Sequence, residues 1–355
     1  MITPSQKETT APRPKGLALE ETRALAKDLG EPAYRGDQLF GWLHKTGVQS
    51  YDEATNLPKR FRAKLEALGP PTTLALVEFS EAPDGSGKFL FRTESGELVE
   101  SALIPGEGRA TLCVSTQVGC PLDCAFCATG KMGFRANLDA GEILDQYLMA
   151  SRRLDVPITN VVYMGMGEPL LNYDATVRSL RLLLDERAIG LGRKRVTVST
   201  AGVPPAIDRL ADEGVRVKLA ISVHSPFEDV RSRIAPVNRK YSLADTLAAA
   251  ERYARATDTR VTLEYAAIAN INDRDEDARA LAKIAGRFPS KVNVIPLNPV
   301  PELDEALVPS PPERVERFVE LLRAKNVDAF VRKTVGREVE AACGQLTTTH
   351  NTRHL

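Results

Sequence analysis

The spacing of hydrophobic residues changes twice along the chain, and each stretch predicts a different kind of structure. Between residues 19 and 68, apolar residues recur at steps of three and four, which is typical of amphipathic helices. Between residues 72 and 104, apolar and polar residues alternate around a turn at 84–87, which predicts antiparallel strands. After residue 109, short β-branched segments alternate with longer segments of helical period. The pattern predicts a helical domain, a β extension and an α/β core, in that order.

The α/β core contains six apolar segments that each read as a strand followed by a helix. Apolar strands joined by helices form parallel sheets with right-handed crossovers, so six units predict an incomplete parallel barrel. The expected strands are 111–115, 161–164, 195–199, 217–223, 260–265 and 291–296, and the expected helices are 140–154, 175–188, 205–212, 243–256, 275–288 and 312–325. We therefore predict an α/β protein with a partial, TIM-like (βα)6 barrel.

Prolines and clusters of polar residues mark the boundaries of five expected segments. Residues 1–16 are expected to be disordered, 17–70 to form a helical accessory domain that binds RNA, 71–105 a β extension, 106–346 the core barrel and 347–355 a tail. Four basic residues of the helical domain form either a solvated helix face or a surface that contacts RNA, and they are Lys59, Arg60, Arg62 and Lys64.

The composition gives the protein no bulk attraction to nucleic acid. Over 355 residues, 47 Lys and Arg balance 47 Asp and Glu, so RNA binding would have to use local patches. Residues 1–15 have no apolar core of a signal peptide, and no apolar run is long enough to span a bilayer. Five cysteines, three of them bunched, are typical of cofactor and catalytic thiols in a reducing compartment. We expect a cytoplasmic protein without a membrane segment.

The three bunched cysteines are Cys120, Cys124 and Cys127, in a C-x-x-x-C-x-x-C pattern that follows the first expected core strand. Thiolates at short spacing select zinc or iron–sulfur clusters. A structural zinc site usually needs a second pair of ligands further along the chain, and no such pair exists here. Three ligands suit a [4Fe–4S] cluster with one open iron. The spacing resembles that of radical S-adenosylmethionine (SAM) enzymes, in which SAM fills the open position.

Polar residues and glycines follow the ends of the other expected strands, where the chemistry of parallel barrels gathers. Gly167 and Glu168 follow the second strand, where glycine would admit a ligand and the carboxylate could accept hydrogen bonds from the SAM amino group. A tight turn is the alternative interpretation. Polar residues that could bind the SAM ribose and carboxylate end the later strands, and each could instead be a satisfied turn residue; they are Ser199, Ser222, His224 and Asn298. Val223, between Ser222 and His224 at the same strand end, is also expected to contribute to the cofactor site.

Two further cysteines lie outside the cluster motif. Cys343 belongs to a glycine-flanked segment near the end of the chain, which could bend over the mouth of the barrel or bury a small hydrophobic side chain. Cys113 lies within an expected strand, where simple core packing is equally consistent with the sequence.

Taken together, these motifs closely resemble the bacterial dual-specificity adenine-C2 RNA methyltransferases. The resemblance runs from about residue 34 to residue 346, and the tail is less basic than is usual in the family. These radical SAM enzymes methylate an adenosine in the peptidyl-transferase region of 23S rRNA and, in some members, an adenosine beside the tRNA anticodon. The segments that carry the resemblance are Glu100, 109–115, 117–120, the cluster motif, 164–169, 239–241, Arg332 with Lys333, and 341–346.

The resemblance implies a role for each cysteine. Cys343 takes a methyl group from one SAM, the cluster cleaves a second SAM, and the activated methyl group adds to carbon 2 of the adenine. Glu100 is implied as the base that removes the ring proton, and Cys113 as the thiol that attacks Cys343 in a transient disulfide to release the RNA. A flavodoxin- or ferredoxin-type electron donor is implied, and we expect a monomer.

The RNA would need phosphate contacts around the barrel mouth, because its target base must leave the stack. The candidates are 193–195, Arg231, Arg233, Arg239 with Lys240, and Arg332 with Lys333. Two other functions stay open. One is methylation of carbon 8 of the same adenosine, and the other is a non-catalytic RNA-binding protein in which the cluster cysteines hold zinc with Cys113 or a histidine.

Overall fold

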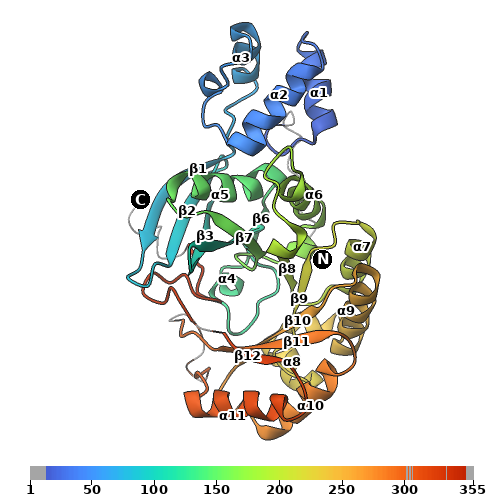
Figure 1. The fold of residues 1–355 in the computed structure, drawn as a ribbon. Helices are drawn as coiled ribbons and strands as arrows, with labels where there is room; N and C mark the ends of the chain where they lie inside the picture. The colour runs from blue at the N-terminus through green and yellow to red at the C-terminus, as the bar shows by residue number, and fades with distance from the viewer. Residues whose placement is uncertain (1–12, 301–302, 304, 306, 333, 349–355) are drawn as a thin grey trace.

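Ten strands form one sheet in the computed structural model, which describes residues 13–300, 303, 305, 307–332 and 334–348 (Figure 1). Their order is β1-β2-β3-β4-β7-β8-β9-β10-β11-β12, and from β4 onward every pair is parallel. The parallel strands are β4 (Arg109–Cys113), β7 (Ile158–Tyr163), β8 (Val196–Thr200), β9 (Lys218–Ser222), β10 (Val261–Ala267), β11 (Ser290–Pro296) and β12 (Ala329–Val331). The six expected core strands are present, which confirms the prediction of a parallel α/β core.

Helices connect the parallel strands and cover the outer face of the sheet (Figure 1). Helix α5 starts at a capping box, in which the Asp139 carboxylate accepts a hydrogen bond from the Glu142 N–H at 2.8 Å. The six expected helices are present as α5 (Ala140–Arg153), α6 (Tyr173–Leu184), α7 (Pro204–Asp212), α9 (Leu243–Thr257), α10 (Asp275–Ala285) and α11 (Pro312–Arg323).

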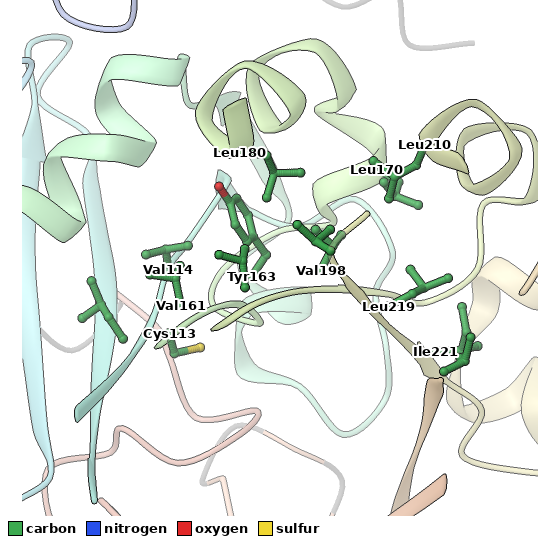
Figure 2. Close-up of a cluster of buried hydrophobic side chains, with 14 of the residues drawn as sticks. Cys113, Val114, Val161, Tyr163, Leu170, Leu180, Val198, Leu210, Leu219 and Ile221 are labelled. Atoms are coloured by element: carbon green, nitrogen blue, oxygen red, sulfur yellow. The ribbon is translucent and has the colours of Figure 1, made fainter. Parts of the chain in front are cut away.

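Apolar side chains of the strands and the covering helices meet in one cluster (Figure 2). Burial of each such side chain contributes roughly 1.5–3 kcal/mol of transfer free energy. The labelled members are Cys113, Val114, Val161, Tyr163, Leu170, Leu180, Val198, Leu210, Leu219 and Ile221. This core fixes the strand ends, which lie beside the site described below.

The sequence pattern missed the short elements of the core. These are the hairpin of β5 (Gln117–Gly119) and β6 (Phe134–Asn137), the one-turn helix α4 (Ala128–Lys131), helix α8 (Glu228–Ile234) and strand β12. An element of three to seven residues contains too few positions for a period of two or 3.6 to be recognised. Several of them border the site, so the missed elements matter more than their length suggests.

The β extension is antiparallel, as the alternation predicted. It consists of β1 (Leu74–Glu81), β2 (Gly87–Thr93) and β3 (Leu98–Gly106). Strand β3 then pairs antiparallel with β4, so the extension covers the edge of the first barrel strand.

The N-terminal helices pack around a cluster of their own. They are α1 (Leu19–Asp28), α2 (Tyr34–Gly41) and α3 (Lys59–Glu66), with single turns at Trp42–Thr46 and Tyr51–Glu53. Three basic residues of α3 have local partners: Arg60 pairs with Glu31, Arg62 with Asp52, and Lys64 with the Leu29 carbonyl oxygen. These contacts support the interpretation of a solvated helix face, and contact with RNA stays a prediction.

A buried ion pair joins the start of the described chain to the barrel. Lys15 Nζ lies 3.2 Å from Asp145 Oδ1 on α5, and it donates to the Leu43 carbonyl oxygen at 2.8 Å. Asp145 also accepts hydrogen bonds from the N–H and hydroxyl of Thr73. The expectation of disorder up to residue 16 is therefore wrong for 13–16, because Lys15 has a buried partner. Residues 1–12 and 349–355, which include the rest of that segment and most of the expected tail, lie outside the described residues.

Within the described part of the chain, no helix combines the length and apolar character that a bilayer span requires.

Replacing Lys15 with alanine leaves the buried Asp145 carboxylate without its cation. Because an unpaired buried charge is costly, we expect Lys15→Ala to lower the free energy of unfolding by about 3–5 kcal/mol in urea titrations. The exposed Lys45→Ala variant serves as the control and should change it by less than about 0.5 kcal/mol. Equal stability of the two variants would contradict the importance of this pair.

Candidate active site

The cluster cysteines lie on the loop between β5 and α4, and backbone hydrogen bonds hold this loop at both ends. Cys120 donates its N–H to the Gly133 carbonyl oxygen, and Ala125 donates to that of Ile234 on α8. Gly119 has a φ of 70°, and a Cβ there would lie 1.7 Å from the Gly133 carbonyl oxygen. The loop can therefore approach the β6 strand only with glycine at this position.

The loop forms one wall of a cavity of about 180 Å³. Most of the predicted cofactor residues line this cavity together, although they come from five different strand ends. They are Cys120, Cys124, Cys127, Gly167, Glu168, Ser199, Ser222, His224 and Asn298. Val223 is the exception, because its side chain is buried in the core and its N–H donates to the Glu264 carbonyl oxygen at 3.0 Å.

Glu168 is 3% exposed, and both of its carboxylate oxygens accept backbone hydrogen bonds. Oε1 accepts from the Leu170 N–H at 3.0 Å, and Oε2 accepts from the Ala201 N–H at 2.8 Å. Burial raises the pKa of Glu168. Gly167 has a φ of 97°, and a Cβ there would meet the Gln117 side chain at 2.5 Å. Gly167 and Glu168 therefore form a tight, hydrogen-bonded turn. Because both residues also line the cavity, the interpretation as a ligand site stays open.

His224 has a defined protonation state. Its Nδ1 accepts a hydrogen bond from the Ala266 N–H at 3.0 Å, so the proton of the neutral ring is on Nε2. Burial, together with the charge of Arg231, lowers the pKa of His224 to about 3. His224 therefore offers a neutral Nε2–H donor near neutral pH rather than a charge.

Cys113 and Cys343 both line a second, smaller cavity of about 80 Å³ that adjoins the first. Cys343 and Cys127 line both cavities, whereas Cys113 lines only the smaller one. Figure 2 shows Cys113 at the lower edge of the buried cluster. Burial raises the pKa of Cys113 to about 12. Cys113 therefore packs in the core, as one interpretation predicted, and it also lines the smaller cavity.

The C-terminal segment reaches this position through hydrogen bonds to the loop and to the barrel. The Ala128 N–H donates to the Gly344 carbonyl oxygen at 2.8 Å, and the Thr129 hydroxyl donates to that of Leu346 at 2.6 Å. The Asn298 amide donates to the Cys343 carbonyl oxygen at 2.9 Å. Cys343 is therefore held at the wall of both cavities, as a segment bent over the mouth predicted.

Glu100 lies beneath the same segment, on β3. Its Oε2 accepts a hydrogen bond from the Thr347 N–H at 2.9 Å, and its Oε1 lies 3.1 Å from Lys88 Nζ. Burial raises the pKa of Glu100 to about 7, although the charge of Lys88 opposes the shift. It is not an ordinary surface carboxylate, because it is fully buried.

Two of the predicted phosphate contacts are wrong. Arg231 is fully buried, and it donates to the carbonyl oxygens of Val223, Ser222 and Ala201, so it holds strand ends instead of RNA. Residues 193–195 precede β8 and therefore lie at the opposite edge of the sheet from the site. Arg233, Arg239 and Lys240 are exposed near α8, Arg332 lines both cavities, and Lys333 lies outside the described residues.

The sequence assigned no role at the site to Gln117 or Glu264. The Gln117 side chain accepts a hydrogen bond from the Glu168 N–H at 2.8 Å, and no pattern in the sequence signals this contact. Glu264 lines the larger cavity and is 4% exposed. A carboxylate inside the otherwise apolar β10 was the available signal for it.

The cysteine loop fits an iron–sulfur cluster by the chemistry of its donors. Burial raises the pKa of all three thiols, and a bound cation would reverse that shift. Among the residues that the structure describes, no group of three His, Cys, Asp or Glu side chains is close enough to hold a single metal ion.

Two family models match the chain. Residues 114–282 match the radical SAM superfamily, and residues 15–69 match the ribosomal RNA large subunit methyltransferase N-terminal domain.

Relatives match over nearly the whole chain. A probable dual-specificity RNA methyltransferase RlmN of Symbiobacterium thermophilum is 43% identical over 96% of this chain and 92% of its own. The dual-specificity RNA methyltransferase RlmN of Marinobacter nauticus is 42% identical over 93% and 91%. The crystal structure of a radical SAM methyltransferase from Sphaerobacter thermophilus superimposes with a TM-score of 0.89 at 43% identity, covering 93% of this chain and 98% of that one.

Substitution of Gly167 tests the shape of the larger cavity. An added methyl group would clash with Gln117 and displace Glu168, so we expect Gly167→Ala to weaken SAM binding at least about tenfold in equilibrium dialysis. Gly214→Ala is the matched control, because Gly214 has a φ of 70° but open space around it. Unchanged SAM affinity in Gly167→Ala would contradict a ligand site beside this glycine.

Proposed function

The chain belongs to the dual-specificity RNA methyltransferases of the radical SAM superfamily, and on this basis we propose that it methylates carbon 2 of an adenosine in 23S rRNA and of an adenosine beside the tRNA anticodon. The enzymes of this superfamily use a [4Fe–4S] cluster and SAM, which are therefore the cofactors of this chain.

One observation carries the proposal. Cys343 lines two adjoining cavities, one shared with all three cluster cysteines and the other with Cys113. A group that must first accept a methyl group and then deliver it to RNA needs access to both a cofactor and a resolving thiol. The position of Cys343 meets both needs.

Different residues of the chain would hold the cluster and SAM. Cys120, Cys124 and Cys127 would hold the cluster, and Gly167, Glu168, Ser199, Ser222, His224 and Asn298 would hold SAM. Val223 would support this wall indirectly, through its buried side chain and its N–H bond to the Glu264 carbonyl oxygen. When bound, the cluster and SAM supply the radical chemistry that activates a methyl group. The neutral Nε2–H of His224 can donate a hydrogen bond to a ribose hydroxyl or to the SAM carboxylate.

Cys343 is proposed to carry the methyl group. Carbon 2 of adenine has no lone pair, so it cannot attack the methyl group of SAM as a nucleophile. A thiolate can, and Cys343 would become S-methylcysteine before the methyl carbon bonds to carbon 2. The RNA is then linked covalently to Cys343.

Glu100 is proposed as the base that removes the proton from carbon 2. Its side chain shares a face of β3 with Ala102, which lines the smaller cavity, because strand side chains alternate. A carboxylate with a pKa of about 7 is suited to take a proton near neutral pH.

Cys113 is proposed to release the RNA by attacking the sulfur of Cys343. All five cysteines are free thiols in this structure, and the proposed disulfide between Cys113 and Cys343 would form only during the catalytic cycle. The RNA would present a splayed adenosine, with exposed Arg233, Arg239 and Lys240 as remaining candidates for phosphate contacts. A flavodoxin- or ferredoxin-type donor and a monomeric state complete the proposal.

Methylation of Cys343 is the first test. Protein that contains iron, incubated with SAM without oxygen, should gain one methyl group on Cys343 in peptide mass spectrometry, and Cys343→Ala should gain none. Nucleoside analysis of the reacted RNA should then show 2-methyladenosine. An unmodified Cys343 in iron-containing protein would contradict the carrier role, 8-methyladenosine would change the site of methylation, and zinc in place of iron would favour the RNA-binding alternative.

The role of Glu100 predicts a pH dependence. Only the deprotonated carboxylate acts as a base, so the rate of methylated RNA formation should fall about tenfold per pH unit below about 7 and level off above it. Glu100→Gln should lower the rate at least about 100-fold at every pH. The exposed Glu107→Gln variant is the control and should keep the wild-type profile. Wild-type activity in Glu100→Gln would assign the base to another group.

A further inference from the structure

Arg332 is the one Lys or Arg among the described residues that line the two cavities. It follows β12, and its backbone N–H donates to the Val294 carbonyl oxygen of β11 at 2.8 Å. Both cavities therefore have a single positive side chain at their shared wall. None of the proposed catalytic steps uses this charge.

The guanidinium is linked to Cys113 through one residue. Arg332 Nη1 lies 3.7 Å from the sulfur of Met164, and the backbone N–H of Met164 is hydrogen-bonded to the Cys113 thiol. Arg332, Met164, Cys113 and Cys343 all line the smaller cavity. The charge therefore lies beside both thiols that the cycle must join.

Cys113 is the thiol that most needs a positive charge. It is 5% exposed, burial raises its pKa to about 12, and a charge on Cys343 would raise the pKa further. A thiol in that state is almost entirely protonated near neutral pH, whereas only the thiolate attacks sulfur. Among the side-chain charges near Cys113, that of Arg332 lowers its pKa. A guanidinium suits this task because it stays charged even where water is scarce.

Glu264 on β10 is a carboxylate that lines the larger cavity together with Arg332. Its Oε1 accepts a hydrogen bond from Asn293 at 3.0 Å, and its Oε2 has no hydrogen-bond partner among the described residues. The charge of Cys343, and then that of Glu264, raises the pKa of Arg332, which keeps the guanidinium charged. Arg332 thus shares its cavities with the Glu264 carboxylate and with both thiols.

We infer that Arg332 is a positioning residue for RNA release, whose charge stabilises the Cys113 thiolate that attacks the sulfur of Cys343. The inference rests on the proposed function. In this step, the Cys113 thiolate supplies the electron pair of the new S–S bond, and the bond between Cys343 Sγ and the methylene carbon breaks. The electron pair of that bond goes to the methylene carbon, which takes up one proton and becomes the methyl group. An external dithiol later reduces the disulfide.

The test separates release from the earlier steps. Iron-containing Arg332→Gln, Arg332→Lys and wild-type proteins are incubated with SAM, reductant and a 23S rRNA fragment, and covalent protein–RNA adduct is measured on denaturing gels. We expect Arg332→Gln to methylate Cys343 normally and to accumulate at least about tenfold more adduct than wild type, because one pKa unit changes the thiolate fraction about tenfold. Arg332→Lys should release most of the RNA. Arg279→Gln, an exposed substitution on α10, is the control.

Release of methylated RNA by Arg332→Gln at the wild-type rate would overturn the inference. So would an unmethylated Cys343 with no adduct, because the charge would then serve an earlier step.

A second measurement does not depend on RNA. In the Cys343→Ala background, the rate at which Cys113 reacts with a small methanethiosulfonate is followed by peptide mass spectrometry. Arg332→Gln should slow this reaction at least about tenfold, and Arg332→Lys and Arg279→Gln should not. Equal rates would overturn the inference. If wild-type protein forms neither S-methylcysteine nor adduct, the proposed function fails, and these rates alone decide the role of Arg332.

Discussion

The hydrogen bond between the Ala128 N–H and the Gly344 carbonyl oxygen, 2.8 Å long, joins the end of the cysteine loop to the end of the described chain. Beside it, the Thr129 hydroxyl and the Leu346 carbonyl oxygen connect residues 217 positions apart. Cys343 lies within this contact, so its distance from the cluster loop is set by backbone groups rather than by its own side chain. A site built this way can form only after the last segment has folded onto the barrel, because long-range contacts close last.

Buried polar groups then fix the wall that faces this segment. The peptide of Ala201 is held from both sides, since its N–H donates to Glu168 and its carbonyl oxygen accepts from Arg231. Arg231 also joins the ends of β9 and the following loop by its bonds to Ser222 and Val223. Burying a charged side chain is costly unless each donor is satisfied, and here the strand ends supply the acceptors. The cavity therefore keeps its shape without a ligand to organise it.

The sequence was informative where a feature is local. The parallel strands were predictable because strands buried on both faces are continuously apolar, and the cluster cysteines because three thiols fall within eight residues. The position of Cys343 beside Cys113 depends on hydrogen bonds to Ala128 and Asn298, which no spacing encodes. Charge was the weakest guide to function. Both Arg231 and Arg332 follow strands, yet Arg231 is buried against carbonyl oxygens, whereas Arg332 lines a cavity with Cys113 and Cys343. Burial separates them, and burial follows only from the fold.

The two cavities explain why the proposed methyl carrier, Cys343, lies at their shared wall. The larger cavity is lined by the three cluster cysteines and by residues proposed to hold SAM, and the smaller one by Cys113, Ala102 and Ile104. A buried thiol such as that of Cys113 stays protonated unless a positive charge is near. Because Cys343 lines both spaces, it can react first with the cofactor in the larger cavity and later with Cys113 in the smaller one. Arg332, the cation at the same wall, can make the Cys113 thiol reactive without opening the smaller cavity to solvent.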